Sequence, residues 1–151
     1  MSEDRHELAL GMILQLVVVL NEDMTKSLER DGLTNSRAPV VWFLGQNGPM
    51  TQKELATAVG VSARNITGLV DALEATGFVA RGPHPTDRRA TLVSLTALGD
   101  KTARAMDRDK AELAELLFTG IPERKLDAFV DVLGEVLGRI NRELERLKEA
   151  G

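Results

Sequence analysis

The stretch that decides the fold is residues 51–95, TQKELATAVGVSARNITGLVDALEATGFVARGPHPTDRRATLVSL. It opens with a capping box, because Thr51 precedes a helical pattern and Glu54 follows three positions later. Gly60 ends this short helix, and Ser62 is a suitable N-cap for a longer one. Two helices joined by a tight glycine turn form a helix-turn-helix.

The second helix, residues 62–76, has one apolar and one polar face. The apolar residues follow the helical spacing i, i+3, i+4, i+7, namely Ile66, Leu69, Val70 and Leu73. Arg64 and Asn65 are suited to bind guanine and adenine through paired hydrogen bonds. Since recognition helices contact bases chiefly from their N-terminal residues, we predict that this helix lies in a DNA major groove. The alternative is that both side chains only solvate a surface helix.

Residues 78–81 and 91–95 are predicted to be two strands, which the polar, proline-bearing loop 82–90 joins into a hairpin. Because this hairpin follows a helix-turn-helix directly, it is predicted to be a wing. Arg88 and Arg89 lie at its tip. An arginine there is suited to a narrow, A·T-rich minor groove, whose negative potential is enhanced.

Asp87 does not suit a DNA contact, because its carboxylate repels phosphate. We interpret it as a wing-stabilising residue that fixes an arginine through a charge-assisted bond. In this interpretation Arg89 is the clamped side chain and Arg88 the more exposed one, although the sequence leaves open which of the two enters the groove. His84 and Asp87 alone are too few ligands for a metal site, so no metal is expected.

Both ends of the chain have long helical patterns. The first spans about residues 6–30 and is apolar on every side near Leu16 and Leu20, so it needs a cover all round. The last spans about 123–148 and carries a seam with alternating steps of three and four residues, which is typical of coiled coils. We predict that both helices serve dimerisation; the alternative is packing within one protomer. Further helices are expected at about 34–46 and 97–117.

These patterns predict a mainly α fold with a small β-hairpin wing, a winged helix-turn-helix with long N- and C-terminal dimerisation helices. One continuous fold is expected to hold an N-terminal dimerisation helix at 1–32, a DNA-binding region at 33–96 and C-terminal dimerisation helices at 97–151.

The composition excludes several other classes. The 151 residues contain no cysteine and no tyrosine, and we find no nucleophile–base pair, metal cluster or glycine-rich phosphate loop, so neither an enzyme nor a cofactor is expected. No uninterrupted apolar run approaches the ~20 residues of a membrane span, and a cytoplasmic protein is expected. The net charge is −4, but residues 51–95 hold five basic and four acidic side chains and are the only segment that is not acidic.

Two strings resemble the MarR family of regulators. Residues 61–81 look like its recognition helix and first wing strand, and residues 85–99 are similar to its wing signature, in which Asp-Arg-Arg precedes a strand and Leu-Thr-x-x-Gly. The resemblance covers nearly the whole chain. It implies a homodimeric transcriptional regulator, more commonly a repressor, with a palindromic operator and a pocket for a small aromatic or anionic effector. Gly68 and Ala72 depart from positions that are often basic in the family, which predicts fewer phosphate contacts.

The residues expected to contact DNA come from the helix-turn-helix and the wing: Thr51, Ser62, Arg64, Asn65, Thr67, Gly68, Arg81, Arg88 and Arg89. Arg37 and Trp42 are the expected effector residues, although Arg37 equally suits a surface position and Trp42 a core position. The alternative function is that of a helical dimer that binds a protein partner without binding DNA.

Overall fold

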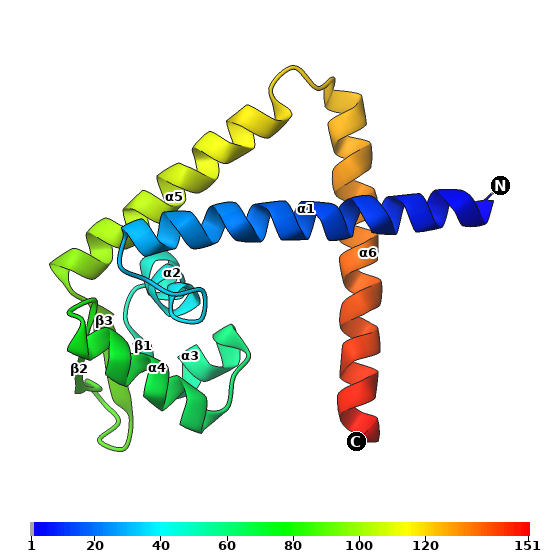
Figure 1. The fold of residues 1–151 in the computed structure, drawn as a ribbon. Helices are drawn as coiled ribbons and strands as arrows, with labels where there is room; N and C mark the ends of the chain where they lie inside the picture. The colour runs from blue at the N-terminus through cyan, green and yellow to red at the C-terminus, as the bar shows by residue number, and fades with distance from the viewer. Residues whose placement is uncertain (1) are drawn as a thin grey trace. The chain divides into compact units, whose positions relative to one another are not determined.

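The computed structural model describes residues 2–151, with side chains from residue 4 on. This part of the chain forms helices and short strands in one order (Figure 1): α1 Ser2–Arg30, α2 Ala38–Asn47, β1 Met50–Thr51, α3 Gln52–Val59, α4 Ala63–Ala75, β2 Val79–Pro83, β3 Thr91–Leu95, α5 Ala97–Phe118 and α6 Glu123–Ala150. The chain separates into two compact units, one up to Asp107 and one from Arg108 to Gly151. The mainly α winged-helix fold is thereby confirmed.

All the helices that the sequence predicts are present, with shifted ends. α1 begins at Ser2, four residues earlier than expected. α2 begins only at Ala38, which places Pro39 in the first turn. A proline is tolerated there, because the N–H that it lacks would have no partner within the helix. β2 is likewise displaced toward the wing, to Val79–Pro83.

The sheet has a third strand that the sequence analysis missed. β3 lies in the centre and pairs antiparallel with both neighbours, in the order β1-β3-β2. Arg81 of β2 and Met50 of β1 both lie opposite Val93 of β3. The predicted hairpin of β2 and β3 is confirmed. β1 was not predicted, because its two residues are too short a run to show any alternation.

The core lies in the first unit, where the helix-turn-helix packs on α2 and the sheet. Its fully buried side chains come from α2, α3, α4 and β3: Val40, Val41, Leu44, Leu55, Ile66, Val70, Leu73 and Val93. α4 contacts both α3 and β2 (Figure 1). The core thus fixes the recognition helix to the short helix before it and to the wing after it.

Gly99 allows α5 to begin close to the end of the recognition region. A Cβ atom at this position would lie 2.0 Å from the carbonyl oxygen of Phe78. Thr96 closes the same junction, since its hydroxyl donates to the carbonyl of Gly77 at 2.6 Å and accepts from the N–H of Gly99 at 3.1 Å. The Leu-Thr-x-x-Gly string therefore joins the wing to α5 by close backbone packing.

α1 and α6 keep much apolar surface uncovered. The exposed apolar side chains of α1 include Leu8, Leu10, Met12, Leu14, Leu16, Val17, Val18, Val19 and Met24. None of the side chains of α6 is buried. By length and composition alone, residues 4–30 are apolar enough to cross a membrane, with a mean hydropathy of 1.5 over the most apolar stretch. The sequence did not predict this, because the longest uninterrupted apolar run of α1, Leu16 to Leu20, has only five residues.

Candidate nucleic-acid interface

The recognition helix α4 starts with a side-chain cap. Ser62 has extended backbone angles, and its Oγ accepts the N–H of Asn65 at 3.1 Å. This bond satisfies one of the free N–H groups of the first turn. The cap leaves the Ser62 hydroxyl hydrogen available and places the start of the helix at the surface, where the remaining N–H groups favour an anion.

The two faces of α4 differ as the sequence predicts. Ile66, Val70 and Leu73 are buried, whereas the outward residues Ser62, Arg64, Asn65, Thr67, Gly68 and Asp71 are exposed. No described hydrogen bond or ion pair uses the side chain of Arg64 or Asn65. Both side chains are therefore free for an external partner.

The hydroxyl of Thr67 makes two hydrogen bonds to other residues of the protein. Its hydroxyl donates to the carbonyl of Ala63 at 2.9 Å and accepts from Nε2 of Gln52 in α3, also at 2.9 Å. The sequence analysis missed Gln52, because nothing in the chain order shows that the first residue of α3 meets the second turn of α4.

The guanidinium of Arg81 is also bound by other residues of the protein. Its guanidinium makes ion pairs with Asp71 at 2.7 Å and Glu74 at 3.3 Å, both on α4. Its Nε donates to Oε1 of Gln52 at 3.1 Å, and one terminal nitrogen reaches the carbonyl of Thr67 at 3.3 Å. These internal partners occupy the guanidinium, so we withdraw Arg81 from the expected DNA contacts.

The wing loop is shaped by its own side chains. Oδ1 of Asp87 accepts the backbone N–H of Arg89 at 3.0 Å. Nδ1 of His84 accepts the backbone N–H groups of Thr86 at 3.2 Å and of Asp87 at 3.0 Å. Such local bonds are the usual way in which Asp and other short polar side chains hold turns.

The expected clamp between Asp87 and an arginine side chain is not formed. The carboxylate of Asp87 bonds the backbone of Arg89 and not its guanidinium. Among the described residues, no hydrogen bond or ion pair uses the guanidinium of Arg88 or of Arg89, and both side chains are exposed. The division into one clamped and one exposed arginine was therefore wrong, and the wing presents two cations.

Thr51 closes the capping box of α3 as expected. Its hydroxyl accepts the N–H of Glu54 at 3.1 Å, and the carboxylate of Glu54 accepts the N–H of Thr51 at 3.2 Å. The side chain of Thr51, then its backbone N–H, and more weakly the charge of His84 favour the ionised carboxylate, so the pKa of Glu54 lies below its ordinary value. The box fixes the first turn of α3, from which Gln52 hydrogen-bonds to Thr67 of α4.

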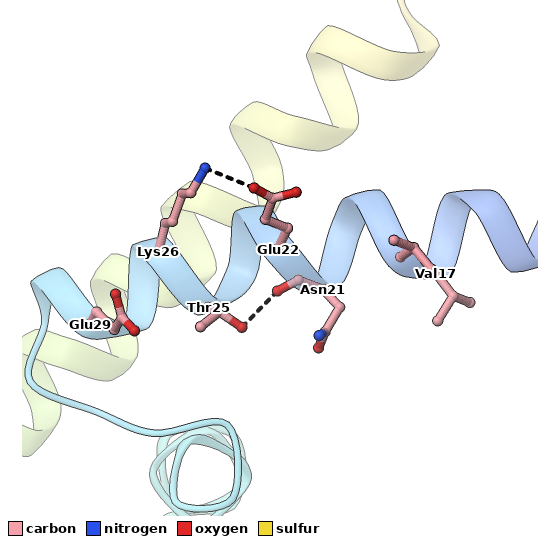
Figure 2. A pocket seen from close by; sticks show the side chains of 7 residues that line it. Val17, Asn21, Glu22, Thr25, Lys26 and Glu29 are labelled. Atoms are coloured by element: carbon pink, nitrogen blue, oxygen red, sulfur yellow. Dashed lines mark hydrogen bonds and ion pairs between the residues drawn. The ribbon is translucent and has the colours of Figure 1, made fainter.

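The expected effector residues lie on and before α2. Arg37 occupies the N-cap position without a side-chain cap bond, and the ring of Trp42 packs edge-on against Phe43 at 5.0 Å. Neither residue lines the shallow hollow on one face of α1 (Figure 2), where Lys26 pairs with Glu22 at 3.1 Å and Thr25 donates to the carbonyl of Asn21. The hollow is lined by α1 alone, so it has no opposite wall.

The described residues contain no group of side chains suited to bind a metal ion. Within residues 4–151, no three His, Cys, Asp or Glu side chains come together in a way that could hold a metal ion.

Known proteins share this arrangement. Residues 33–91 match the model of the MarR family. The chain is 34% identical over 107 residues to the HTH-type transcriptional regulator YcgE of Bacillus subtilis. The aligned region covers 71% of this chain and 70% of YcgE. It is 28% identical over 124 residues to the HTH-type transcriptional repressor IacR of Pseudomonas putida. This aligned region covers 82% of this chain and 68% of IacR.

A solved structure agrees with the fold. The structure of FabT from Streptococcus pneumoniae in complex with DNA matches with a TM-score of 0.74 at 22% identity and covers 95% of this chain and 98% of FabT. Nothing in these comparisons supports a dimer that binds a protein partner in place of DNA. With an exposed recognition helix, a wing with two free arginines and these relatives, the chain belongs to the MarR family of DNA-binding transcriptional regulators and is not an enzyme.

Proposed function

We propose that the protein is a cytoplasmic homodimer that binds a palindromic operator, with α4 in the major groove and the wing in the minor groove. The observation that carries this proposal is the pair of unpaired side chains at the start of α4, Arg64 and Asn65, together with the free guanidinium groups of Arg88 and Arg89. In this arrangement residues 33–96 bind DNA, while residues 1–32 and 97–151 form the dimer.

The contacts divide by chemistry. Arg64 and Asn65 read base edges, because each can make two hydrogen bonds to one purine. Ser62 uses its hydroxyl hydrogen on a phosphate, since its oxygen already accepts the N–H of Asn65. Thr51 contacts a phosphate from the N-cap of α3. Gly68 lets a phosphate approach the backbone of α4, because nothing lies within 4 Å of the place of its missing side chain.

The wing test uses the two arginines separately. Arg88→Ala and Arg89→Ala are each expected to weaken operator binding by about 1–3 kcal/mol if that side chain enters the groove. The duplex is selected from a random library with the wild-type protein, and binding is measured by fluorescence anisotropy. Arg104→Ala is the matched control, because it also removes an exposed arginine, whose described ion pair is with Asp100 on α5. Unchanged affinity in both wing variants contradicts the proposed docking.

The dimer proposal rests on the uncovered apolar faces of α1 and α6. Leu137 and Ile140 of α6 are 53% and 54% exposed in the single chain. Apolar surface of this extent is normally covered by a partner, and two copies of a seam such as that of α6 suit one another. Sedimentation at micromolar concentration is expected to show a dimer for the wild type and a monomer for Leu137→Glu/Ile140→Glu. A monomeric wild type contradicts the proposal.

The regulatory part of the proposal follows from family membership. We propose that the protein acts as a repressor and that a small aromatic or anionic effector releases it, with Arg37 pairing a carboxylate and Trp42 stacking on a ring. Aromatic carboxylates are screened by thermal shift, and each hit is tested for release of the selected duplex. A hit that releases the wild type but acts equally on Arg37→Ala and Trp42→Leu contradicts the assignment of these two residues.

A further inference from the structure

Arg81 lies where the wing, the recognition helix and the first helix of the helix-turn-helix meet. We call the polar network around it the Arg81 tie, which comprises Gln52 of α3, Thr67, Asp71 and Glu74 of α4, and Arg81 of β2. The guanidinium contacts α3 through Gln52 and α4 through both carboxylates. Glu74 also accepts the backbone N–H of Arg81 at 3.0 Å, and Gln52 bonds the Thr67 hydroxyl. The network therefore joins three separate elements.

The tie explains why a DNA-binding helix carries two carboxylates. Asp71 and Glu74 are three residues apart, so they lie on the same side of α4, and their side chains are 62% and 44% exposed. Arg64 is the one basic residue of the helix. Without compensation, both carboxylates would repel the phosphates beside a major groove. The guanidinium of Arg81 contacts both and neutralises part of this charge.

The geometry requires an arginine. A guanidinium offers five N–H donors in a rigid plane, and Arg81 directs them to four acceptors on two helices. A lysine ammonium at the end of a flexible stem keeps the charge but does not hold that plane. The Arg81 side chain is only 23% exposed, so its bonds are better shielded from water than those of surface ion pairs.

We infer that Arg81 is a positioning residue for operator recognition, because it fixes the angle between α4 and the wing while both hold DNA. The inference rests on the proposed docking of α4 and the wing. It predicts that the tie affects the discrimination between operator and other DNA more than the total affinity. A small rotation of α4 against the wing misplaces the base contacts, whereas phosphate attraction depends mainly on charge.

The test compares Arg81→Lys, Arg81→Ala and the double variant Arg81→Ala/Asp71→Asn with the wild type. Each protein is titrated with the selected operator duplex and with a scrambled duplex of the same composition, at several salt concentrations. Arg81→Lys is expected to lose about tenfold in the ratio of the two affinities, at the lower end of the loss of one groove contact. Its affinity for the scrambled duplex is expected to stay the same, because its charge does.

The double variant separates charge from geometry. Arg81→Ala leaves one negative charge uncompensated and is expected to weaken binding to both duplexes. Adding Asp71→Asn restores the net charge, so binding to the scrambled duplex is expected to recover, while the ratio stays low because the tie is not remade. If Arg81→Ala does not fold by circular dichroism, Arg81→Lys carries the test.

Two results overturn the inference. One is an Arg81→Lys protein with wild-type affinity and ratio. The other is a parallel loss on both duplexes in Arg81→Ala with a salt slope lower by about 0.9, which identifies a direct phosphate contact. A wild type that selects no DNA sequence contradicts the proposed docking, and the inference fails with it. A wild type that selects an operator, beside an Arg81→Lys protein that matches it, contradicts the inference alone.

Discussion

α4 and α6 have the same kind of sequence but a different environment. Each is an amphipathic helix whose apolar residues recur every three or four positions. In α4 that face is in the core, where Leu73 is 0% exposed. In α6 no side chain is buried, and Leu137 at the centre of its seam is 53% exposed. The periodicity therefore identifies an apolar face in both helices but does not identify what covers it.

The difference shows how stability is distributed. The first unit has its own core of side chains from α2, α3, α4 and β3. α6, by contrast, exposes most of the apolar residues that its sequence places on one face. In the proposed dimer, its free energy of folding comes largely from the partner. We therefore expect substitutions in the core of the first unit to act at every protein concentration and substitutions in α6 to act only where the protein is dimeric.

Leu73→Ala and Leu137→Ala test this difference with the same chemical change. Leu73→Ala is expected to lower the free energy of unfolding by about 2–5 kcal/mol, because it leaves a cavity in a closely packed core. Leu137→Ala is expected to change it by less than about 0.5 kcal/mol in the dissociated protein, as an exposed position does. Urea denaturation followed by circular dichroism, at a nanomolar and a micromolar protein concentration, gives both values.

Concentration is the control in this pair. The loss in Leu73→Ala is expected at both concentrations, and a loss in Leu137→Ala only at the higher one. Equal effects of the two substitutions at the lower concentration would show that α6 is packed within its own protomer.

Gly99 and Gly134 extend the comparison to close backbone packing. A Cβ atom on Gly99 would lie 2.0 Å from the carbonyl oxygen of Phe78, whereas nothing lies within 4 Å of one on Gly134 in α6. Gly99→Ala is expected to cost about 1–3 kcal/mol, the usual range for overpacking. Gly134→Ala is expected to stabilise the dissociated protein by about 0.5–1 kcal/mol, because alanine favours a helix.

Thermal unfolding measures both changes. A Gly99→Ala protein as stable as the wild type would contradict the close packing of α5 on the end of the recognition region. A Gly134→Ala protein that is destabilised only at high concentration would place a partner helix directly over Gly134.

The sequence predicts the local features well because local chemistry causes them. The caps at Thr51 and Ser62 follow from residues three positions apart, and the buried side of α4 follows from its periodicity. Both are confirmed. β1 was missed because its pairing with β3 is set by the fold and not by a pattern in its own two residues.

The role of Arg81 could not be read from residues close in sequence. Its ion-pair partners on α4 precede it by ten and seven positions, and Gln52 precedes it by 29. One signal was present, since Asp71 and Glu74 form a like-charged pair on a helix expected to bind DNA, and such a pair calls for a nearby cation. At Asp87 the residue was noticed, but the sequence gives no means to distinguish a bond to the backbone of Arg89 from one to its side chain.

The helix starts give the smallest expected effect. α3 has a capping box, whereas α6, which begins at Glu123, has Pro122 as its N-cap and no side-chain cap bond. Because the bonds to Thr51 lower the pKa of Glu54 below 4.5, the ionised carboxylate stabilises the fold. This contribution is complete above the unfolded pKa and is lost as the pH falls through the lower folded value. Urea midpoints of wild type and Glu54→Gln are therefore expected to differ slightly at pH 7 and to converge below pH 4.5.

Glu123→Gln at the start of α6 is the matched control for that pH dependence. Glu123 also lies in the first turn of its helix but makes no described side-chain bond, so Glu123→Gln removes a first-turn carboxylate without removing a cap bond. A Glu54→Gln curve that stays parallel to the wild type at every pH would mean that the box holds α3 through the hydroxyl of Thr51 without help from the carboxylate. In that case the first turn of α3, where Gln52 lies, would be capped by one bond fewer than the structure indicates.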